Sequence, residues 1–91
     1  MRLEVTSKFR KDYKRCVKRG LDVSSLEKII DLLLDGKTLD EQYKDHPLSG
    51  NYLGFRECNI QSDWLLIYKK DTNNLILTAV RTGTHSDLFD E

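Results

Sequence analysis

The sequence has 91 residues, with 15 Lys or Arg balanced by 15 Asp or Glu, so its formal net charge is zero. This length predicts one domain over residues 1–91, which buries roughly 60–65% of its unfolded surface around one modest core. No apolar run approaches the roughly 20 residues of a membrane span, and the N-terminus has no apolar signal segment, which argues against a membrane or secreted protein. We expect a soluble, cytoplasmic protein.

The charges are unevenly distributed along the chain. Residues 1–20 carry eight basic and two acidic side chains, whereas residues 21–47 carry three basic and seven acidic ones. The basic end favours an anionic partner, although a solvated helix face would explain the same charges. The two cysteines lack the spacing of a metal site or a redox motif, so we expect free thiols, with Cys16 packed as a small hydrophobe.

The N-terminal half predicts a short strand followed by a helix. Leu3–Thr6 alternates apolar and polar residues, which is typical of a strand. Ser7 is expected to cap the helix and Gly20 to end it. Almost all positions outside the apolar face of this helix are Lys or Arg. The apolar face consists of Phe9, Tyr13, Cys16 and Val17.

A second helix is predicted from Ser24, which has capping-box spacing to Glu27, and it ends at Gly36. The connection between the two helices is short, so they should form an antiparallel hairpin. Residues 37–54 then form a polar connection that contains the only proline, Pro47, and loops of this length usually carry function.

Three strands should follow, over Phe55–Ile60, Trp64–Tyr68 and Leu75–Val80, separated by tight polar turns. Consecutive strands with such turns predict an antiparallel meander. The middle strand is apolar throughout, which indicates a central position covered on both faces. Because the helical hairpin can cover only one face, we expect a partly open groove on the other, with Trp64 near its rim. The predicted fold class is α+β.

A few residues could support cleavage of RNA without a metal. The reaction needs a base for the 2′-hydroxyl proton, an acid for the leaving 5′-oxygen and a cation for the charge on phosphorus. Taken singly, each residue has a structural explanation, such as a turn residue, a surface histidine or an ion pair. The residues alone therefore predict a small α+β domain with an anion site. The residues considered are His46, His85, Asp63, Glu57 and Arg81, with Arg56 and Lys44 in reserve.

Four segments together resemble the YafQ branch of the RelE-type toxins of type II toxin–antitoxin systems. They are residues 43–50 (YKDHPLSG), 54–58 (GFREC), 63–68 (DWLLIY) and 81–89 (RTGTHSDLF). Their order and spacing extend the resemblance over essentially the whole chain. It implies a RelE-like fold, with a short first strand, a two-helix antiparallel hairpin, a three-strand meander that completes a mostly antiparallel sheet, and a short C-terminal segment.

The resemblance also implies an activity, because members cleave mRNA within the ribosomal A site. We therefore expect a ribosome-dependent endoribonuclease that works by metal-independent attack of the 2′-hydroxyl, needs no cofactor and inhibits translation. Its expected partners are the 70S ribosome, mRNA and a cognate antitoxin of the DinJ or RelB type. The chain would be a monomer alone and part of a hetero-oligomer with the antitoxin.

Residue roles follow from the same resemblance. His85 matches the C-terminal catalytic histidine, expected to be the general acid, and His46 and Asp63 match positions tied to proton abstraction or orientation of the 2′-hydroxyl. Glu57 matches an acidic position that lines the site, and Arg81 the arginine expected at the scissile phosphate. Trp64 and Phe89 match aromatics that position the nucleotide. Beyond the resemblance, the further residues expected to bind substrate are Asn59, Arg56 and Lys44.

Asn59 departs from the family, which often has a histidine at this point. On an alternating strand Asn59 shares a face with Glu57, so its amide should reach the groove. An amide can donate a hydrogen bond but cannot exchange a proton at neutral pH, so we expect His46, Asp63 or Glu57 to be the base.

The basic first helix and the overall activity both leave alternatives open. The helix cations could grip RNA phosphates or form a solvated face. Other functions are a ribosome-independent ribonuclease, a non-enzymatic inhibitor like the ParE toxins that act on DNA gyrase, and an RNA-binding module with an impaired site. The proton-transfer groups argue against an inhibitor that acts by binding alone. The cations are Lys8, Arg10, Lys11, Lys14, Arg15, Lys18 and Arg19.

Overall fold

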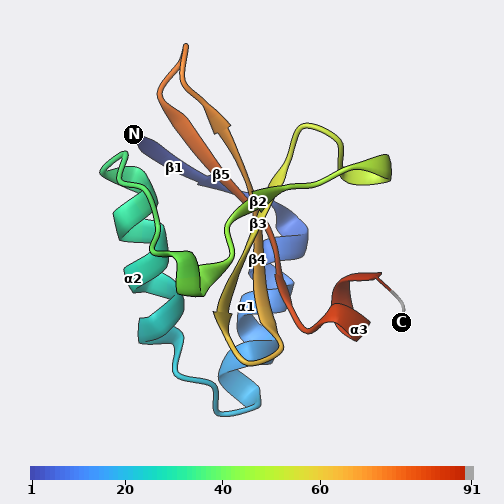
Figure 1. The fold of residues 1–91 in the computed structure, drawn as a ribbon. Coiled ribbons are helices and arrows are strands. Elements are labelled where there is room, and N and C mark those ends of the chain that lie inside the picture. The colour runs from blue at the N-terminus through green and yellow to red at the C-terminus, as the bar shows by residue number, and fades with distance from the viewer. Residues whose placement is uncertain (90–91) are drawn as a thin grey trace.

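The computed structural model describes residues 1–89 (Figure 1). Within this range five strands form one sheet in the order β1-β5-β4-β3-β2. The helices are α1 (Ser7–Lys18), α2 (Val23–Leu34) and α3 (His85–Phe89), with short 3-10 helices η1 (Glu41–Tyr43) and η2 (Gly50–Tyr52). The strands are β1 (Arg2–Val5), β2 (His46–Pro47), β3 (Arg56–Gln61), β4 (Trp64–Asp71) and β5 (Ile76–Gly83). No helix in the described part of the chain is long and apolar enough to cross a membrane.

The predicted fold class is confirmed, since the sheet is mostly antiparallel and follows a strand and two helices. β3, β4 and β5 form the meander, and only β1 is parallel to its neighbour β5. The two-residue strand β2 was not predicted and lies within the polar connection 37–54. It pairs with β3 so that His46 is directly opposite Glu57. Pro47 fits this edge strand because it has no N–H to donate.

Both long helices have caps other than the predicted ones. Thr6, not Ser7, caps α1, because its side-chain oxygen accepts a hydrogen bond of 3.0 Å from the N–H of Phe9. Asp22, not Ser24, caps α2 and accepts a hydrogen bond of 3.1 Å from the N–H of Ser24. In each case two residue types suited to capping lie close together, and sequence spacing selected the wrong one. Such a cap stabilises a helix by about 1 kcal/mol.

The main core lies between the two long helices and one face of the sheet. Cys16 and Cys58 are buried in it as free thiols, as predicted, and burial raises the pKa of Cys58 to about 12. Each fully buried large aliphatic side chain stabilises the fold by about 1.5–3 kcal/mol. The most deeply buried members include Leu26, Ile29, Leu33, Leu66, Tyr68 and Leu77.

The opposite face of the sheet carries a smaller core beneath η2 and α3. Leu65 and Ile67 of β4 are fully buried there, and Leu88 of α3 packs against them. Figure 1 shows α3 and α2 on opposite sides of the sheet. Leu88 thus anchors α3 on the face that the hairpin leaves free, and α3 begins with His85. The middle strand is buried on both faces, as its composition predicted.

Trp64 does not face the groove, so the prediction that it lies at the rim is wrong. Side chains alternate along β4, and Trp64 points with Leu66 into the main core, where it is 3% exposed. Its indole N–H donates to the Thr82 hydroxyl at 2.9 Å, and that hydroxyl donates to the Leu65 carbonyl at 2.7 Å. The buried polar atoms of both side chains are therefore satisfied within the core.

The last residues of β5 form an edge that α1 closes. β1 pairs with β5 only as far as Val5 opposite Ala79, so β5 continues past the end of its neighbour. Asp12 of α1 fills this place, because its carboxylate accepts a hydrogen bond of 3.1 Å from the N–H of Thr82. The same carboxylate accepts from the Arg81 guanidinium at 2.6 Å. Buried Asp12 thereby fixes the position of Arg81.

Candidate functional site

His85 and Asp63 form an exposed acid–base pair at one end of the sheet. Asp63 lies in the turn between β3 and β4, and its Oδ1 is 2.5 Å from Nδ1 of His85. The backbone N–H of His85 donates to the same oxygen at 3.1 Å. The hydrogen bond with the His85 side chain, aided by the backbone one, lowers the pKa of Asp63 below its ordinary value. Asp63 is therefore an ionised acceptor that orients the imidazole with a proton on Nδ1.

His46 and Glu57 form a second pair, which is built across the β2–β3 ladder. The Nε2 atom of His46 is 3.0 Å from Oε2 of Glu57, and its Nδ1 is 2.6 Å from the backbone carbonyl of Lys44. A carbonyl only accepts, so Nδ1 carries a proton and one further proton lies between the two side chains. Lys44, predicted to hold substrate, thus contributes its carbonyl here. Among the described residues, Oε1 of Glu57 is buried without a hydrogen-bond partner.

Arg81 lies in a cationic hollow between α1 and the edge of β5. The hydrogen bond with Asp12 raises the pKa of Arg81, and the neighbouring phenol of Tyr52 raises it further. The hollow has a volume of about 390 Å³. Four cations face one anion in it, so it attracts phosphate groups. Its lining residues are Lys8, Lys11, Asp12, Arg15 and Arg81.

The structure divides the cations of the first helix into groups. Lys8, Lys11 and Arg15 lie on the side of α1 that meets β5 and line the cationic hollow. Arg10 and Lys14 instead flank a more apolar hollow on another side of the helix. The predicted cations therefore line more than one hollow. The three residues next to Arg81 are the ones best placed to act together on an anion.

A carboxylate that the sequence analysis did not select fixes α3 to α1. Asp87 accepts hydrogen bonds of 2.7 and 3.2 Å from the guanidinium of Arg19. It also accepts from the N–H of Thr84 at 3.0 Å, and its own N–H donates to the Thr84 hydroxyl at 3.1 Å. Arg19 above all holds the pKa of Asp87 well below its usual range. The Thr84–Asp87 spacing resembles a capping box, which is the signal that could have revealed it.

Gly83 is required where the chain passes from β5 to α3. Its φ is +154°, and a Cβ at this position would lie 2.9 Å from Oδ2 of Asp87. A larger residue would push the Asp87 carboxylate away from Arg19. The ion pair between Asp87 and Arg19 therefore depends on a glycine two residues before His85.

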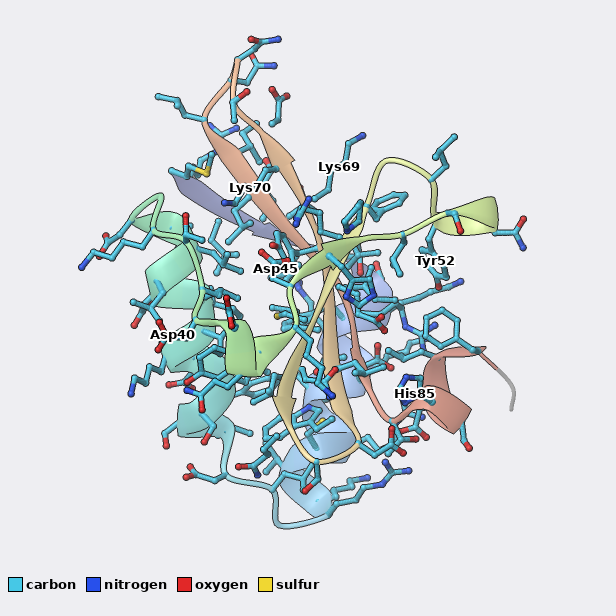
Figure 2. The ribbon with its side chains drawn as sticks, in the orientation of Figure 1. Asp40, Asp45, Tyr52, Lys69, Lys70 and His85 are labelled. Carbon is cyan, nitrogen blue, oxygen red and sulfur yellow. The ribbon has the colours of Figure 1, made fainter. Side chains whose placement is uncertain are left out.

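A series of aromatic rings connects η2 with α3 beside the His85–Asp63 pair. Phe89, predicted to hold substrate, has its ring centroid 6.2 Å from that of His85. Tyr52, which the sequence analysis did not select, meets Phe89 edge to face at 5.8 Å and Phe55 at 5.9 Å. In Figure 2, Tyr52 and His85 lie on the α3 side of the molecule. Asp90 and Glu91, which end the predicted C-terminal segment, lie outside the described residues.

Two further residues that were predicted to contact substrate form hydrogen bonds within the protein. Arg56, kept in reserve as a substrate contact, points to the helix side of the sheet, where its Nε donates to Asp45 at 3.3 Å. Tyr68 donates to the same Asp45 oxygen at 2.6 Å. Asn59 does share the face of Glu57, but its amide donates to the carbonyl of Ser62 at 3.2 Å and stabilises the β3–β4 turn.

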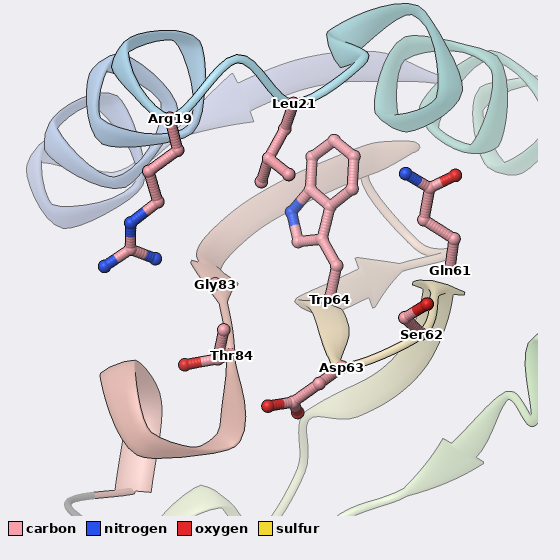
Figure 3. Close-up of a pocket in the computed structure, with 8 residues that line it drawn as sticks. All are labelled: Arg19, Leu21, Gln61, Ser62, Asp63, Trp64, Gly83 and Thr84. Atoms are coloured by element: carbon pink, nitrogen blue, oxygen red, sulfur yellow. The ribbon is translucent and has the colours of Figure 1, made fainter.

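A separate hollow of about 280 Å³ borders the site next to Asp63 (Figure 3). Leu21 and the edge of the Trp64 indole form its apolar wall, and Arg19 lies at its side. The largely buried Trp64 thus borders a surface hollow together with Asp63. The remaining lining residues are Gln61, Ser62, Gly83 and Thr84.

A helical hairpin packed on one face of a small, mostly antiparallel sheet is the fold of a RelE-like toxin. Within that class the chain belongs to the YafQ family of bacterial toxins of type II toxin–antitoxin systems, whose family model matches residues 1–90.

Named relatives support this membership over nearly full length. The mRNA interferase toxin YafQ of Escherichia coli (strain K12) is 39% identical over 88 residues, which cover 96% of this chain and 94% of the relative. A metal-bound toxin from Helicobacter pylori has a TM-score of 0.91 at 42% identity, and the match covers 98% of this chain and 99% of that one. The E. coli DinJ–YafQ complex matches with a TM-score of 0.89 at 38% identity and the same coverage.

A metal ion held by the protein would need several donor side chains close together. Within residues 1–89 no three His, Cys, Asp or Glu side chains are grouped closely enough to hold a metal ion. The two histidines are each paired with one carboxylate instead.

Proposed function

We propose that this chain is an endoribonuclease that cleaves mRNA and forms a pair with a cognate antitoxin. The observation that carries the proposal is the half-exposed His85 ring, oriented by Asp63 at 2.5 Å and placed beside Phe89. The E. coli relative named as an mRNA interferase supports the same activity. Such a pair resembles the arrangement in which a carboxylate fixes an imidazole for proton transfer.

In the proposed reaction the 2′-oxygen of one nucleotide loses its proton to a base and attacks the adjacent phosphorus. The bond from phosphorus to the 5′-oxygen breaks, and the leaving oxygen takes a proton from an acid. The products are a 2′,3′-cyclic phosphate and a 5′-hydroxyl, without a metal. We assign the acid to His85, because an ionised Asp63 stabilises the protonated imidazole and its ring is accessible.

We assign the base to the His46–Glu57 pair rather than to Asp63. The low pKa of Asp63 and its two hydrogen bonds from His85 make it a weak proton acceptor. The second pair holds one proton between two side chains, and Oε1 of Glu57 has no partner among residues 1–89. When substrate displaces one of its hydrogen bonds, this pair can accept the proton of the 2′-hydroxyl.

Arg81 supplies the positive charge in this proposal. Its guanidinium is held by Asp12 at the base of the cationic hollow, where Lys8, Lys11 and Arg15 raise the local positive potential. The charge that develops on the phosphate oxygens would be stabilised by these preorganised cations. Asn59 contributes indirectly, because it holds the turn that carries Asp63.

We further propose that cleavage takes place in the A site of the 70S ribosome and inhibits translation in the cytoplasm. The cations on α1 support contact with an RNA backbone, whose affinity would then fall steeply with salt. The solved DinJ–YafQ complex supports a cognate antitoxin of the DinJ or RelB type. In this scheme the toxin is a monomer alone and forms a hetero-oligomer with the antitoxin.

The test is cleavage of a defined mRNA by purified protein with and without programmed 70S ribosomes. The wild type is expected to cleave only with ribosomes, and His85→Ala is expected to lose the activity. Lys28→Ala, an exposed change on α2, is the matched control and should behave as wild type. Cleavage without ribosomes would indicate a ribosome-independent ribonuclease, and no cleavage in either condition would overturn the proposal.

A further inference from the structure

The hollow between η2 and α3 has no role in the reaction described so far. It has a volume of about 590 Å³ and borders the aromatic rings next to His85. Two of its lining residues are aromatic, one is a buried leucine and two carry exposed polar side chains. The lining residues are Ser49, Asn51, Tyr52, Leu88 and Phe89.

The chemistry of this lining fits a nucleobase. The rings of Tyr52 and Phe89 meet at 84°, with centroids 5.8 Å apart, and make an apolar corner above the buried side chain of Leu88. A base presents apolar faces that stack on such rings and a polar edge that needs hydrogen bonds. The amide of Asn51 offers both a donor and an acceptor, and the hydroxyl of Ser49 offers either.

The backbone around the hollow is held before any ligand binds. The N–H of Tyr52 donates to the Ser49 carbonyl at 3.2 Å, and the Tyr52 carbonyl accepts from the N–H of Phe55 at 3.0 Å. The N–H of Leu48 then donates to the Phe55 carbonyl at 2.9 Å. These bonds close the 48–55 segment on itself, so the side chains of η2 need little reorganisation to receive a planar ligand.

The hollow lies next to the cationic hollow, in the way that the base of a nucleotide lies next to its phosphate. On one side Phe89 contacts the ring of His85, and on the other Tyr52 neighbours Arg81, which lines the cationic hollow. A base hollow and a phosphate hollow thus meet at Tyr52 and Arg81. In RNA the base and the phosphate of one nucleotide are separated by a ribose, so both hollows could be filled by one unpaired nucleotide.

We propose that this hollow binds a nucleobase of single-stranded RNA next to the scissile phosphate, and that Asn51 determines which base is preferred. The inference rests on the proposed endoribonuclease activity, because it names a subsite of the same site. A protein segment is the other conceivable occupant. RNA is favoured because the rings of the hollow continue through Phe89 to His85, where the phosphodiester would be cut, and Tyr52 neighbours Arg81 at the cationic hollow.

The first experiment maps the ends of mRNA fragments produced on programmed ribosomes by wild type, Asn51→Ala and Asn51→Asp. Asn51→Ala is expected to lower the base preference at one position next to the cut by about tenfold, because the amide no longer reads the base edge. Asn51→Asp replaces the amide donor with an acceptor and should shift the preference towards another base. Asn73→Ala, in the exposed β4–β5 turn, is the matched control and should keep the wild-type profile.

Direct binding separates failure of this inference from failure of the proposed activity. A trinucleotide with 2′-deoxyribose at the cleavage position cannot be cut, so its binding can be followed by NMR whether or not the protein is active. The rings of Tyr52 and Phe89 and the side-chain amide of Asn51 are expected to shift, and Tyr52→Leu should weaken binding about tenfold whereas Tyr52→Phe should not.

Three results would overturn the inference. The first is a wild-type cleavage profile in both Asn51 variants. The second is a trinucleotide that leaves Asn51, Tyr52 and Phe89 unshifted. The third is loss of antitoxin binding in Tyr52→Leu with base preference unchanged, which would assign the hollow to a protein segment. If the trinucleotide binds as expected but no mRNA is cut, the subsite stands and the endoribonuclease activity fails.

Discussion

The two histidines of this chain are each half-exposed and paired with a carboxylate, yet the pairs differ in the burial of that carboxylate and in the elements that they join. Asp63, the partner of His85, has a side chain that is 58% exposed, whereas the side chain of Glu57, the partner of His46, is 8% exposed. The His85 pair joins a turn to the start of a helix, and the His46 pair crosses two strands of the sheet. The two pairs therefore contain similar side chains in different surroundings.

This difference separates the roles that two such pairs can have. An exposed carboxylate with hydrogen bonds from its partner remains charged, so it stabilises a protonated histidine that later gives up a proton. A buried carboxylate with one oxygen unpartnered within residues 1–89 is poorly solvated, and that oxygen is left to accept a hydrogen bond from a substrate hydroxyl. When two acid–base pairs in one active site have different surroundings, the difference is a common basis for assigning one pair as the acid and the other as the base.

The largest effect is expected from removing the ring of the exposed pair. His85→Ala should reduce the single-turnover rate of mRNA cleavage on ribosomes by about 10²–10⁴-fold, the range for loss of a general acid. Because His85 is exposed and Leu88 still anchors α3, the free energy of unfolding should change by less than about 0.5 kcal/mol. A rate loss explained by an equally large loss of stability would contradict the assignment.

The next effect distinguishes the two carboxylates by the pH dependence of the rate. Glu57→Gln should lower the cleavage rate and displace the limb of the pH–rate profile that reports the base, since an amide cannot share the proton of His46. Asp63→Asn should lower the rate by about tenfold or more through misorientation of His85, yet leave that limb in place. If instead Asp63→Asn displaces the limb and Glu57→Gln does not, the roles of the two pairs are reversed.

The support of the exposed pair can be tested through Asp87. Asp87→Ala removes the hydrogen bonds from Arg19 and Thr84, so the free energy of unfolding should fall by about 2 kcal/mol at pH 7. The folded-state pKa of Asp87 is lowered, so its contribution is fully present above the unfolded value of about 3.9 and is lost as pH falls through the folded value.

Denaturant unfolding of wild type and Asp87→Ala at several pH values measures this contribution. The difference between the two proteins should stay constant between pH 7 and 5 and shrink below about pH 4. Asp31→Ala, on the exposed side of α2, is the control that should change stability little at any pH. A difference that grows as pH falls would show that Asp87 does not stabilise α3 as a carboxylate.

The sequence predicted most of the fold because periodicity and turn residues are local signals. The strands and helices could be placed to within a few residues, and the spacing of the family motifs identified both histidines and their carboxylates. The contacts that were missed join distant positions. Asp12 and Arg81 are 69 residues apart, and Arg19 and Asp87 are 68 apart, so no spacing rule connects them. Tyr52 was missed because its ring matters only once η2 meets α3.

The errors within the sheet concern which face a side chain takes. Trp64 was expected near the rim of the groove. Its strand is apolar on both faces, so composition does not indicate which face the indole occupies. Arg56 could have been placed correctly, since alternation sets it opposite to Glu57 on the same strand. A resemblance identifies the residues of a motif, but only the pleat of the strand decides which of them reach the substrate.

The smallest effect is therefore expected at Arg56, and it tests whether the site is confined to the face of the two histidine pairs. Arg56→Ala should leave mRNA cleavage within about twofold of wild type. The loss of its bond with Asp45 should lower the free energy of unfolding by at most about 1 kcal/mol, because that pair is partly exposed and Tyr68 still donates to Asp45. Ribosome cleavage assays alongside denaturant unfolding measure both quantities. A loss of cleavage above tenfold with stability unchanged would mean that RNA also contacts the helix side of β3, and that the two pairs are not the whole site.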